Sequence, residues 1–404
     1  MSENSSKHIL IISQYFYPEQ FRINDLATEW GRRGYEVTVI TGIPNYPKGK
    51  FYPGYGIFTN RKGIYNGVRI IRLPLIPRGQ SSFMMVLNYM SFVISGFFWS
   101  VFTRIQADYV FIFEVSPMTQ ALPGIWYSNR KKIPCYIYVQ DLWPENIEIV
   151  AGIHNKVIIN TIDKMVDYIY GKCTRIFATS PSFCANINDR GIPEGKIEYW
   201  PQYAEEFYKP IDNKSSLIPQ DGVLNVTFTG NIGTAQGLDI LVETAVLLKN
   251  ENILVRFNII GDGRNKANFI NNIKLSNVNE YFNNIEWQPS ELIPSILAAS
   301  DAAFLSFSNN QLFSMTIPAK LQSYIACGIP IIGSVIGESK RIIEEAQCGL
   351  TCDIGDSYGL KDIIMKFISL SDSERKKMAD NAVTYSNNHF NRTKLIDYII
   401  GFFY

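Results

Sequence analysis

Short apolar runs of strand length recur along the chain, and stretches with helical patterning separate them. Because parallel strands need crossover connections, this alternation predicts an α/β domain with a parallel sheet in the first half. Helix-like stretches there include 24–33 and 157–170. The six predicted strands are 8–13, 36–41, 68–73, 108–113, 135–139 and 175–179.

The same alternation restarts in the second half, after a proline-containing seam at 199–221 that is typical of a linker. We therefore expect two Rossmann-like, doubly wound domains, residues 1–200 and 201–388, that face each other across a cleft. A C-terminal helix, 389–404, is expected to pack back on the first domain. In the second domain the predicted strands are 223–229, 254–260, 285–287, 302–305, 329–333 and 349–352, and the predicted helices are 238–249, 291–299 and 319–327.

Charge is distributed unevenly between the two halves. Residues 1–200 carry 21 Lys and Arg against 15 Asp and Glu, whereas the remainder carries 17 against 22, so a net charge of +1 hides a basic first half. No acidic residue lies between Glu36 and Asp108, a window with eight basic residues. This window predicts an anionic partner rather than a merely solvated surface. Nucleic acid is not expected, because aliphatic runs rather than stacking aromatics separate the basic residues.

An uncharged segment, 79–103, lies inside this window. It is long enough to cross a bilayer, but it joins two predicted strands of one sheet. The alternatives are a buried crossover helix and a monotopic helix in the bilayer surface, with a true span the least favoured. The polar start of the chain and its short first apolar run do not match a signal peptide, so a cytoplasmic location is expected.

In doubly wound domains, ligands bind beyond the carboxyl ends of the strands. The loop 230–237, with Gly230, Asn231 and Gly233, follows a predicted strand and is either a phosphate-binding turn or a plain tight turn. A second glycine-containing loop, Gly261-Asp-Gly-Arg264, follows the next predicted strand and carries Arg264. Lys320 falls in the first turn of a helix, where a cation is unfavourable unless an anion binds or the side chain reaches solvent.

Three further residues follow predicted strands of the first domain. Asp141 and Glu145, in Asp-Leu-Trp-Pro-Glu, are candidates for acid–base chemistry, or Asp141 caps a turn. Arg22 follows the first strand and is a candidate anion clamp or a surface arginine. Neither a D-x-D pair nor the motifs of serine hydrolases, zincins or P-loop NTPases occur, and the six Cys and three His are scattered, so no metal site is expected.

These segments, in this order, resemble the family-four retaining glycosyltransferases with the GT-B fold. The resemblance covers nearly the whole chain. It rests on Tyr17-Pro-Glu, Asp141-Leu-Trp-Pro-Glu145, Phe228-Thr-Gly-Asn, Ile259-Ile-Gly-Asp-Gly and Ala326-Cys-Gly-Ile-Pro. The start at 21–25, the Asp-Leu-Trp-Pro-Glu loop and 316–324 resemble a subgroup that transfers N-acetyl-L-fucosamine in O-antigen or capsule synthesis.

The resemblance implies a metal-independent, retaining hexosyltransferase without a cofactor. Its donor would be a UDP-sugar. Its acceptor would be a saccharide on undecaprenyl diphosphate, at the cytoplasmic face of the bacterial inner membrane, with the protein attached peripherally. Asp141 or Glu145 would orient the acceptor hydroxyl. A UDP-sugar epimerase and a non-catalytic subunit of a polysaccharide assembly complex are the alternatives.

The chain departs from the family pattern at the donor site. The family's two glutamates, eight positions apart, are Met315 and Ser323 here, and its phosphate-binding Arg and Lys are Asn231 and Gln236. A histidine common after the strand at 135–139 is Gln140. The resemblance then assigns the ribose to Ser323, the donor sugar to backbone around Thr316, and the uracil to Trp287 and Gln288. The candidates for binding the diphosphate are Lys320, Arg264 and Arg22.

Overall fold

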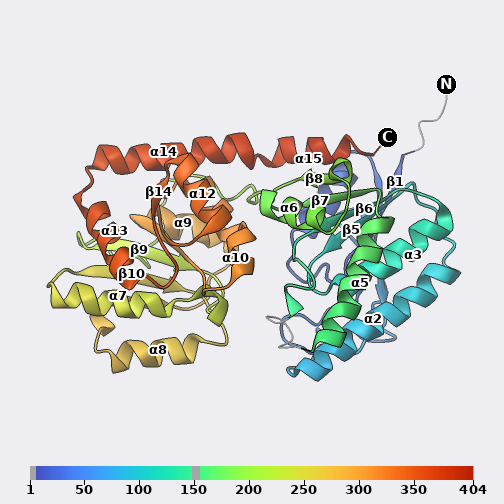
Figure 1. Cartoon of the computed structure of the whole chain (residues 1–404), viewed down its shortest axis with the longest axis horizontal. Coiled ribbons are helices and arrows are strands. Elements are labelled where there is room, and N and C mark those ends of the chain that lie inside the picture. Colours follow the sequence, from blue (N-terminus) through green and yellow to red (C-terminus); the bar gives the residue numbers. More distant parts are fainter. Residues whose placement is uncertain (1–5, 148–154, 404) are drawn as a thin grey trace. The chain divides into compact units, whose positions relative to one another are not determined.

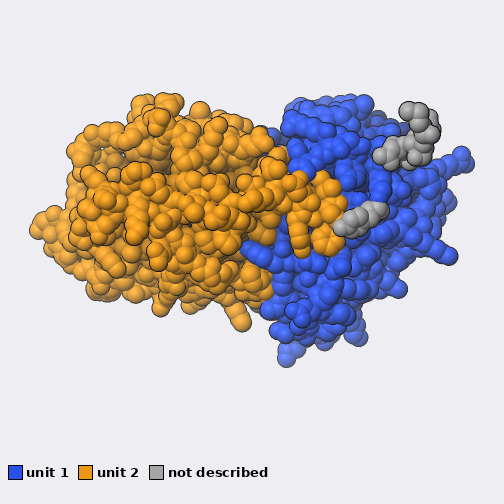
Figure 2. All heavy atoms as spheres, turned by 90° about the horizontal axis from the view of Figure 1, so that it is seen from above, with its two compact units in different colours: residues 1–179, 183–200, 403–404 blue, residues 180–182, 201–402 orange. Residues whose placement is uncertain are grey.

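The computed structural model describes residues 6–147 and 155–403. Contacts divide the chain into two compact units. Unit 1 contains residues 1–179, 183–200 and 403–404, and unit 2 contains residues 180–182 and 201–402 (Figure 2). Each unit is built on its own sheet, in agreement with the two Rossmann-like α/β domains expected from the sequence.

Unit 1 has an eight-stranded sheet in the order β3-β4-β2-β1-β5-β6-β7-β8, in which only β3 is antiparallel to its neighbour. Every residue of β1, β5 and β6 is buried, as expected for parallel strands that helices cover on both faces. The strands are β1 (His8–Ile12), β2 (Glu36–Gly42), β3 (Lys62–Tyr65), β4 (Val68–Leu73), β5 (Tyr109–Glu114), β6 (Cys135–Val139), β7 (Arg175–Ala178) and β8 (Ile197–Tyr199).

Two of the unit 1 helices, α2 and α5, begin at side chains that satisfy free backbone N–H groups. Ser81 accepts a hydrogen bond from Met84 N at the start of α2, and Asn155 caps α5 in the same way. α2 is the crossover from β4 to β5, and it packs mainly on α3 (Figure 1). The helices are α1 (Ile23–Arg32), α2 (Ser82–Phe102), α3 (Leu122–Lys131), α5 (Lys156–Lys172) and α6 (Pro181–Asp189).

Unit 2 has a six-stranded parallel sheet in the order β11-β10-β9-β12-β13-β14. Successive strand residues face opposite sides: Phe304 packs into one core with α7, α8 and α13, and Leu305 into another with α9, α11 and α12. The strands are β9 (Leu224–Thr229), β10 (Val255–Ile260), β11 (Phe282–Ile285), β12 (Ala302–Ser306), β13 (Ile331–Ser334) and β14 (Gly349–Cys352).

Helices lie on both faces of this second sheet, with α7 and α8 below the strands in Figure 1 and α9 and α12 above them. The helices are α7 (Asp239–Asn250), α8 (Lys266–Leu275), α9 (Ile293–Ala298), α10 (Gln311–Met315), α11 (Ala319–Ala326), α12 (Gly337–Ala346), α13 (Ser357–Ser369), α14 (Asp372–His389) and α15 (Arg392–Ile400).

The C-terminal segment is divided between the units. Residues through Phe402, including α15, group with unit 2, whereas Phe403 belongs to unit 1. The Phe403 ring lies 5.3 Å from the rings of Trp30 and Tyr109 and 5.7 Å from that of Tyr136. Phe403, three residues beyond the end of α15, thus packs among the aromatic side chains of the unit 1 core.

Candidate active site

The loops that follow β9 and β10 are bonded to each other at the carboxyl edge of the unit 2 sheet. Gly230 N donates to Ile260 O at 2.8 Å, and Ile232 N donates to Asp262 O at 2.8 Å. A Cβ atom on Gly261 would lie 1.9 Å from Gly230 O. The two loops therefore form one tightly packed glycine-rich surface at the position where this fold binds ligands.

Gly261→Ala should destabilise unit 2 because its φ of +150° and the Gly230 carbonyl leave no room for a methyl group. We expect a loss of about 2–3 kcal/mol in the free energy of unfolding, measured by thermal or urea denaturation. Gly31→Ala is the control: nothing lies within 4 Å of the added Cβ in α1, so this change should be neutral or stabilise by up to about 1 kcal/mol. Equal stability of the two variants would contradict the close approach.

Lys320 lies in the first turn of α11, and its side chain runs beside Gly230. A Cβ on Gly230 would lie 2.6 Å from Lys320 Cε, so the lysine occupies space that only glycine leaves open. Its Nζ stands 4.0 Å from the centroid of the Phe228 ring. Burial lowers the pKa of Lys320 to about 7. Within 6–147 and 155–403, no carboxylate forms an ion pair with it, which leaves a desolvated cation beside the glycine-rich surface.

The other donor-site candidates of unit 2 are distributed over neighbouring loops. Asn231 is exposed beside Gly233, and Gly233 N donates to Gln236 Oε1 at 3.2 Å. Arg264 is exposed in the loop between β10 and α8. Trp287, 64% exposed, lies just beyond β11 together with Gln288, which donates to Glu286 O.

Two candidates near Lys320 already make internal hydrogen bonds. Ser323 is 8% exposed, and its Oγ donates to Ala319 O at 3.0 Å. Thr316 Oγ1 donates to Leu312 O at 3.0 Å. The structure therefore brings Gly230 and Lys320 into contact, whereas the predicted contacts of Ser323 and Thr316 with a nucleotide-sugar stay predictions.

In unit 1, Asp141 lies directly beyond β6 and faces Ser116 beyond β5. Asp141 Oδ2 accepts hydrogen bonds from Ser116 N and Ser116 Oγ, both at 2.7 Å. Glu114, the last residue of β5, is fully buried, and its Oε2 accepts from Asp141 N at 3.5 Å. Burial raises the pKa of both carboxyl groups, and for Glu114 the neighbouring Asp141 raises it further. Glu114 is therefore the member of the pair that holds a proton more readily.

Glu114 was not a candidate in the sequence, because it ends a run of apolar residues that predicts only a buried strand. Its position in the sheet could have identified it, because Glu114 is an acidic residue at the carboxyl end of β5. That end lies next to the topological switch point between β1 and β5. Glu145, by contrast, accepts from Asn186 Nδ2 at 3.0 Å. The structure thus places Asp141 with Glu114 and ties Glu145 to α6.

Two arginines, Arg22 and Arg78, lie near the carboxyl edge of the unit 1 sheet. Arg22 immediately precedes α1, and its charge lowers the pKa of Tyr138, although burial of the phenol outweighs it and raises that pKa. Arg78, one of the basic residues between Glu36 and Asp108, lies with its guanidinium 5.3 Å from the ring centroid of Tyr46 and 5.9 Å from that of Tyr89. Its Nη1 donates to Tyr15 Oη at 3.3 Å. Among the described residues, aromatic groups rather than a carboxylate surround the Arg78 guanidinium, which suits it to an anionic ligand.

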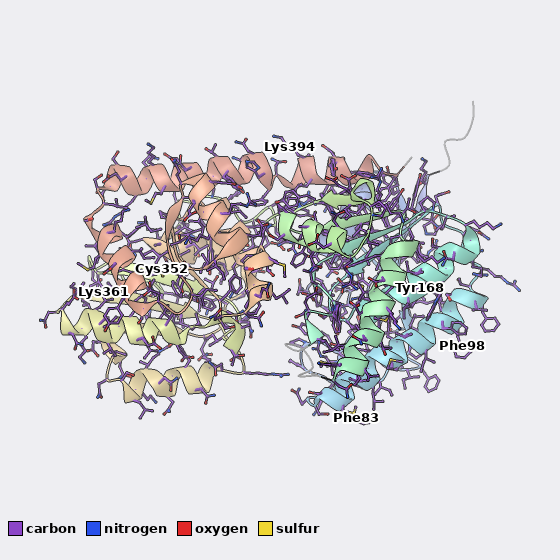
Figure 3. All side chains as sticks on the ribbon, viewed as in Figure 1. Phe83, Phe98, Tyr168, Cys352, Lys361 and Lys394 are labelled. Carbon is purple, nitrogen blue, oxygen red and sulfur yellow. The ribbon has the colours of Figure 1, made fainter. Side chains whose placement is uncertain are left out.

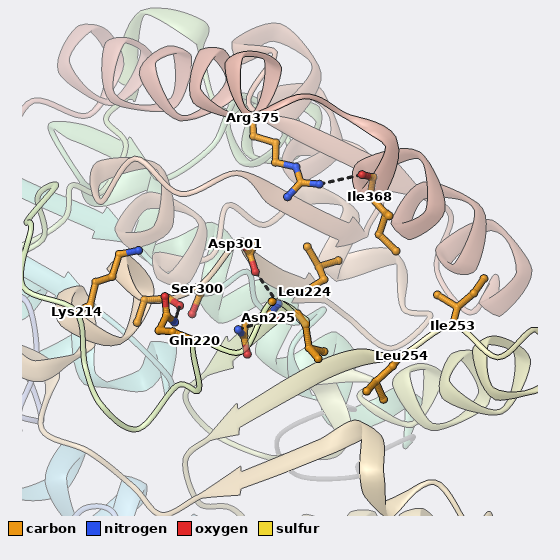
Figure 4. Close-up of a pocket in the computed structure, with 13 residues that line it drawn as sticks. Lys214, Gln220, Leu224, Asn225, Ile253, Leu254, Ser300, Asp301, Ile368 and Arg375 are labelled. Carbon is orange, nitrogen blue, oxygen red and sulfur yellow. Dashed lines mark hydrogen bonds between the residues drawn. The ribbon is translucent and has the colours of Figure 1, made fainter.

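A cavity of about 420 Å³ lies at the other edge of the unit 2 sheet (Figure 4). Its lining includes Asn225 at the start of β9, Leu254 just before β10 and Asp301 just before β12. These are the amino ends of the strands, so this cavity is separate from the glycine-rich surface. In the parts of the chain that the structure describes, no group of three or more His, Cys, Asp or Glu residues could hold a metal ion.

Two protein families match the chain, one on each unit. Residues 21–202 match the family described as glycosyltransferase family 4, and residues 211–384 match the family described as glycosyl transferases group 1. Among named proteins, WcaI of Escherichia coli, named for glycosyl transfer in colanic acid biosynthesis, is 22% identical over 79% of this chain and 81% of its own. WbjE of Pseudomonas aeruginosa, named as a glycosyltransferase, is 24% identical over 58% of this chain, and the alignment spans 60% of WbjE.

Solved structures share the fold over the whole chain. Sucrose-phosphate synthase of Thermosynechococcus elongatus superposes with a TM-score of 0.75 at 14% identity, over 98% of both chains. Anabaena HepE in complex with UDP-glucose gives 0.68 at 13% identity over 98% of both chains. WaaG, a glycosyltransferase involved in lipopolysaccharide biosynthesis, gives 0.67 at 14% identity over 98% of this chain and 100% of its own. With a family match on each unit and this shared architecture, the chain is a glycosyltransferase of the family-four type with the GT-B fold.

Proposed function

We propose that this protein transfers an amino sugar, N-acetyl-L-fucosamine, from its UDP donor to a hydroxyl of a saccharide carried on undecaprenyl diphosphate. The observation that carries the proposal is Lys320, a desolvated cation without a carboxylate partner in the described chain, packed against Gly230. A desolvated ammonium group without a counter-ion is unfavourable, and a bound diphosphate would supply the negative charge that stabilises it. The alternative of a lysine that only reaches solvent does not account for the lowered pKa.

On the donor side, the diphosphate would lie on the glycine-rich surface, where backbone groups approach closely. Lys320 would neutralise the negative charge that develops on the departing phosphate oxygen. This function would explain how the site tolerates the absence of the family's basic residues at Asn231 and Gln236, because Lys320 would supply positive charge to the diphosphate in their place. Arg264, on the next loop, is exposed and free to turn toward the same ligand.

On the acceptor side, the Asp141 carboxylate would orient the attacking hydroxyl, and burial together with Asp141 raises the pKa of Glu114 beside it, which favours the uncharged form of Glu114. The hydroxyl enters on the face that the phosphate leaves, so the configuration at the anomeric carbon is retained. The acceptor proton passes to the departing phosphate oxygen, which leaves as UDP. This scheme needs no metal ion and no protein nucleophile.

The names and titles of similar proteins support the chemistry and the setting. HepE was solved with UDP-glucose, which supports a UDP-sugar donor. WcaI and WaaG are named for colanic acid and lipopolysaccharide biosynthesis, which supports a bacterial surface polysaccharide as the product. The choice of N-acetyl-L-fucosamine rests on the resemblance of 21–25, 141–145 and 316–324 to one subgroup.

A second candidate function is a non-catalytic subunit of a polysaccharide assembly complex, which Met315, Asn231 and Gln236 favour because they replace ligand-binding residues of the family. Calorimetric titration with UDP separates the two. A transferase should bind UDP, and Lys320→Met should weaken that binding. Wild-type protein that gives no binding heat at millimolar UDP would favour the assembly subunit and contradict the proposal.

Donor affinity should fall as the pH rises through 7. Lys320 has a pKa of about 7 without ligand, so it is charged at pH 6 and largely neutral at pH 8. Because a UDP-sugar has no titrating phosphate proton in this range, its dissociation constant should rise about tenfold from pH 6 to pH 8. Calorimetry in buffers of different ionisation enthalpy should also detect proton uptake on binding at pH 8. Lys320→Arg, charged at every pH, should bind with little pH dependence; an unchanged wild-type affinity across this range would contradict the role of Lys320.

A further inference from the structure

Helix α2 carries eight large apolar side chains that the rest of the chain leaves exposed, here called the apolar face. Figure 3 shows Phe83 and Phe98 pointing away from the helix. Phe83 is 70% exposed, Ile94 55% and Phe102 75%. Exposed apolar residues follow one another at intervals of three or four positions, at 83, 86, 90, 94, 97 and 101 and again at 94, 98 and 102. They form a stripe along the helix, which at 21 residues is about 30 Å long. The apolar face consists of Phe83, Val86, Met90, Ile94, Phe97, Phe98, Val101 and Phe102.

The opposite side of α2 is fixed to unit 1 along the whole helix. Met85 and Phe92 are buried, and Ser100, near the C-terminal end, is 1% exposed. Asn88 Nδ2 donates to Ile76 O at 2.6 Å, and Gly96 leaves no room for a Cβ beside Pro123 of α3. α2 is long and apolar enough to cross a membrane, but it cannot do so while this side stays packed. Its apolar face can enter only one leaflet, with the helix axis in the membrane plane.

Basic side chains lie at both ends of α2. At the N-terminal end, Gly79 N donates to Gly49 O and Gln80 Nε2 to Lys48 O, which places Lys48 and Lys50 beside the helix start. At the other end, exposed Arg104 follows the helix, and Arg130 Nη2 donates to Thr103 O at 2.9 Å. No acidic residue occurs in the sequence between Glu36 and Asp108 to offset these charges.

We propose that α2 docks the protein on an anionic phospholipid bilayer, with the apolar face among the acyl chains and the basic residues at both ends on lipid phosphates. The pattern is that of an interfacial helix. A second copy of the chain is the less suitable occupant, because pairing two α2 helices in either direction brings like charges together. The proposal does not rest on the transferase activity, and it places the enzyme on the surface where a lipid-linked acceptor would lie.

The test is co-sedimentation of the purified full chain with vesicles of phosphatidylglycerol and phosphatidylethanolamine, compared with vesicles of phosphatidylcholine. We expect the partition coefficient to be at least about tenfold higher on the anionic vesicles and to fall in 0.5 M NaCl. The F83S/F98S/F102S variant should lose at least about tenfold on the anionic vesicles. The matched control is L275S/Y358S, which removes two exposed apolar side chains of unit 2, 73% and 67% exposed, and should bind like wild type.

Three results would overturn the proposal. Equal vesicle binding by wild type and the triple variant would show that the apolar face is not the membrane-docking surface. Light scattering that shows a wild-type dimer, a monomeric triple variant and no vesicle binding would assign the face to a second copy. Retention in membranes after alkaline carbonate extraction would indicate a spanning helix. Turnover of the triple variant on a short-chain, water-soluble acceptor should stay at the wild-type rate, so loss of docking and loss of transferase function remain distinguishable.

Discussion

Lys320→Met should abolish most of the transferase activity. The methionine keeps the length and apolar stem of the lysine but removes the buried cation beside Gly230, so the leaving diphosphate would lose the positive charge that lies against that glycine. We expect kcat to fall about 10²–10³-fold, the range for removal of a single preorganised group that stabilises developing charge. The donor KM should rise as well, because the cation also acts in the ground state.

Stability separates this effect from misfolding. Removing a desolvated charge should leave the free energy of unfolding unchanged or higher, measured by urea denaturation of the same samples. Lys361→Met is the matched control. Lys361 of α13 forms an ion pair with Glu251, which directly follows α7, and neither residue belongs to the candidate site, so the loss of this lysine should leave kcat unchanged. Normal turnover by Lys320→Met would remove the lysine from the mechanism.

Asp141→Asn should reduce kcat with little change in donor KM. The asparagine Oδ1 can still accept from Ser116 N and Ser116 Oγ, so the local fold should survive, but the negative charge that orients the acceptor hydroxyl is gone. We expect a loss of about 10²–10⁴-fold in kcat, typical of a group that handles the reacting proton. Initial rates at saturating donor and varied acceptor provide the measurement.

Two neighbouring variants give this prediction its controls. Glu145→Gln keeps an acceptor for Asn186 Nδ2 and should cost much less than Asp141→Asn. Glu114→Gln should cost less in kcat than Asp141→Asn, because burial and the neighbouring Asp141 raise the pKa of Glu114 and so favour the uncharged form that glutamine mimics. If Glu145→Gln lowered kcat more than Asp141→Asn does, the catalytic role would belong to Glu145 rather than to Asp141.

The sequence predicted most of the parallel strands of both units because buried parallel strands are nearly continuous apolar runs. The strand predicted at 285–287 is the exception: β11 covers Phe282–Ile285, where two asparagines interrupt the apolar run. β3 and β8 were missed for the opposite reason: Ile64 is 78% exposed at the sheet edge, and β8 has only three residues. The uncharged segment 79–103 is predicted to be either a buried crossover helix or a membrane-surface helix. The structure shows a crossover helix, α2, with one side buried against unit 1 and the other side exposed. Periodicity finds such a helix but does not show how much of it a neighbour such as α3 covers.

The candidate site was only partly predictable. Lys320 stands out in the sequence because a cation in a first helical turn contradicts the helix dipole. Its contact with Gly230 depends on two segments ninety positions apart, which no local pattern reveals. Glu114 and Arg78 were missed because each lies beside an apolar segment, and their partners, Asp141 and Tyr46, come from other strands and loops. Tertiary contacts, rather than residue type, make Glu114 and Arg78 candidates.

The central claim is glycosyl transfer with retention and without a metal ion, and one product analysis tests it most directly. The purified chain would be incubated in EDTA with several UDP-sugars, including UDP-N-acetyl-L-fucosamine, and a short-chain N-acetylglucosaminyl-diphosphate-lipid. We predict a disaccharide-lipid from one preferred donor, UDP released in equal amount, and the donor's anomeric configuration in the product by NMR. An epimerised UDP-sugar formed without acceptor, an inverted linkage, or no release of UDP from any donor would contradict the account.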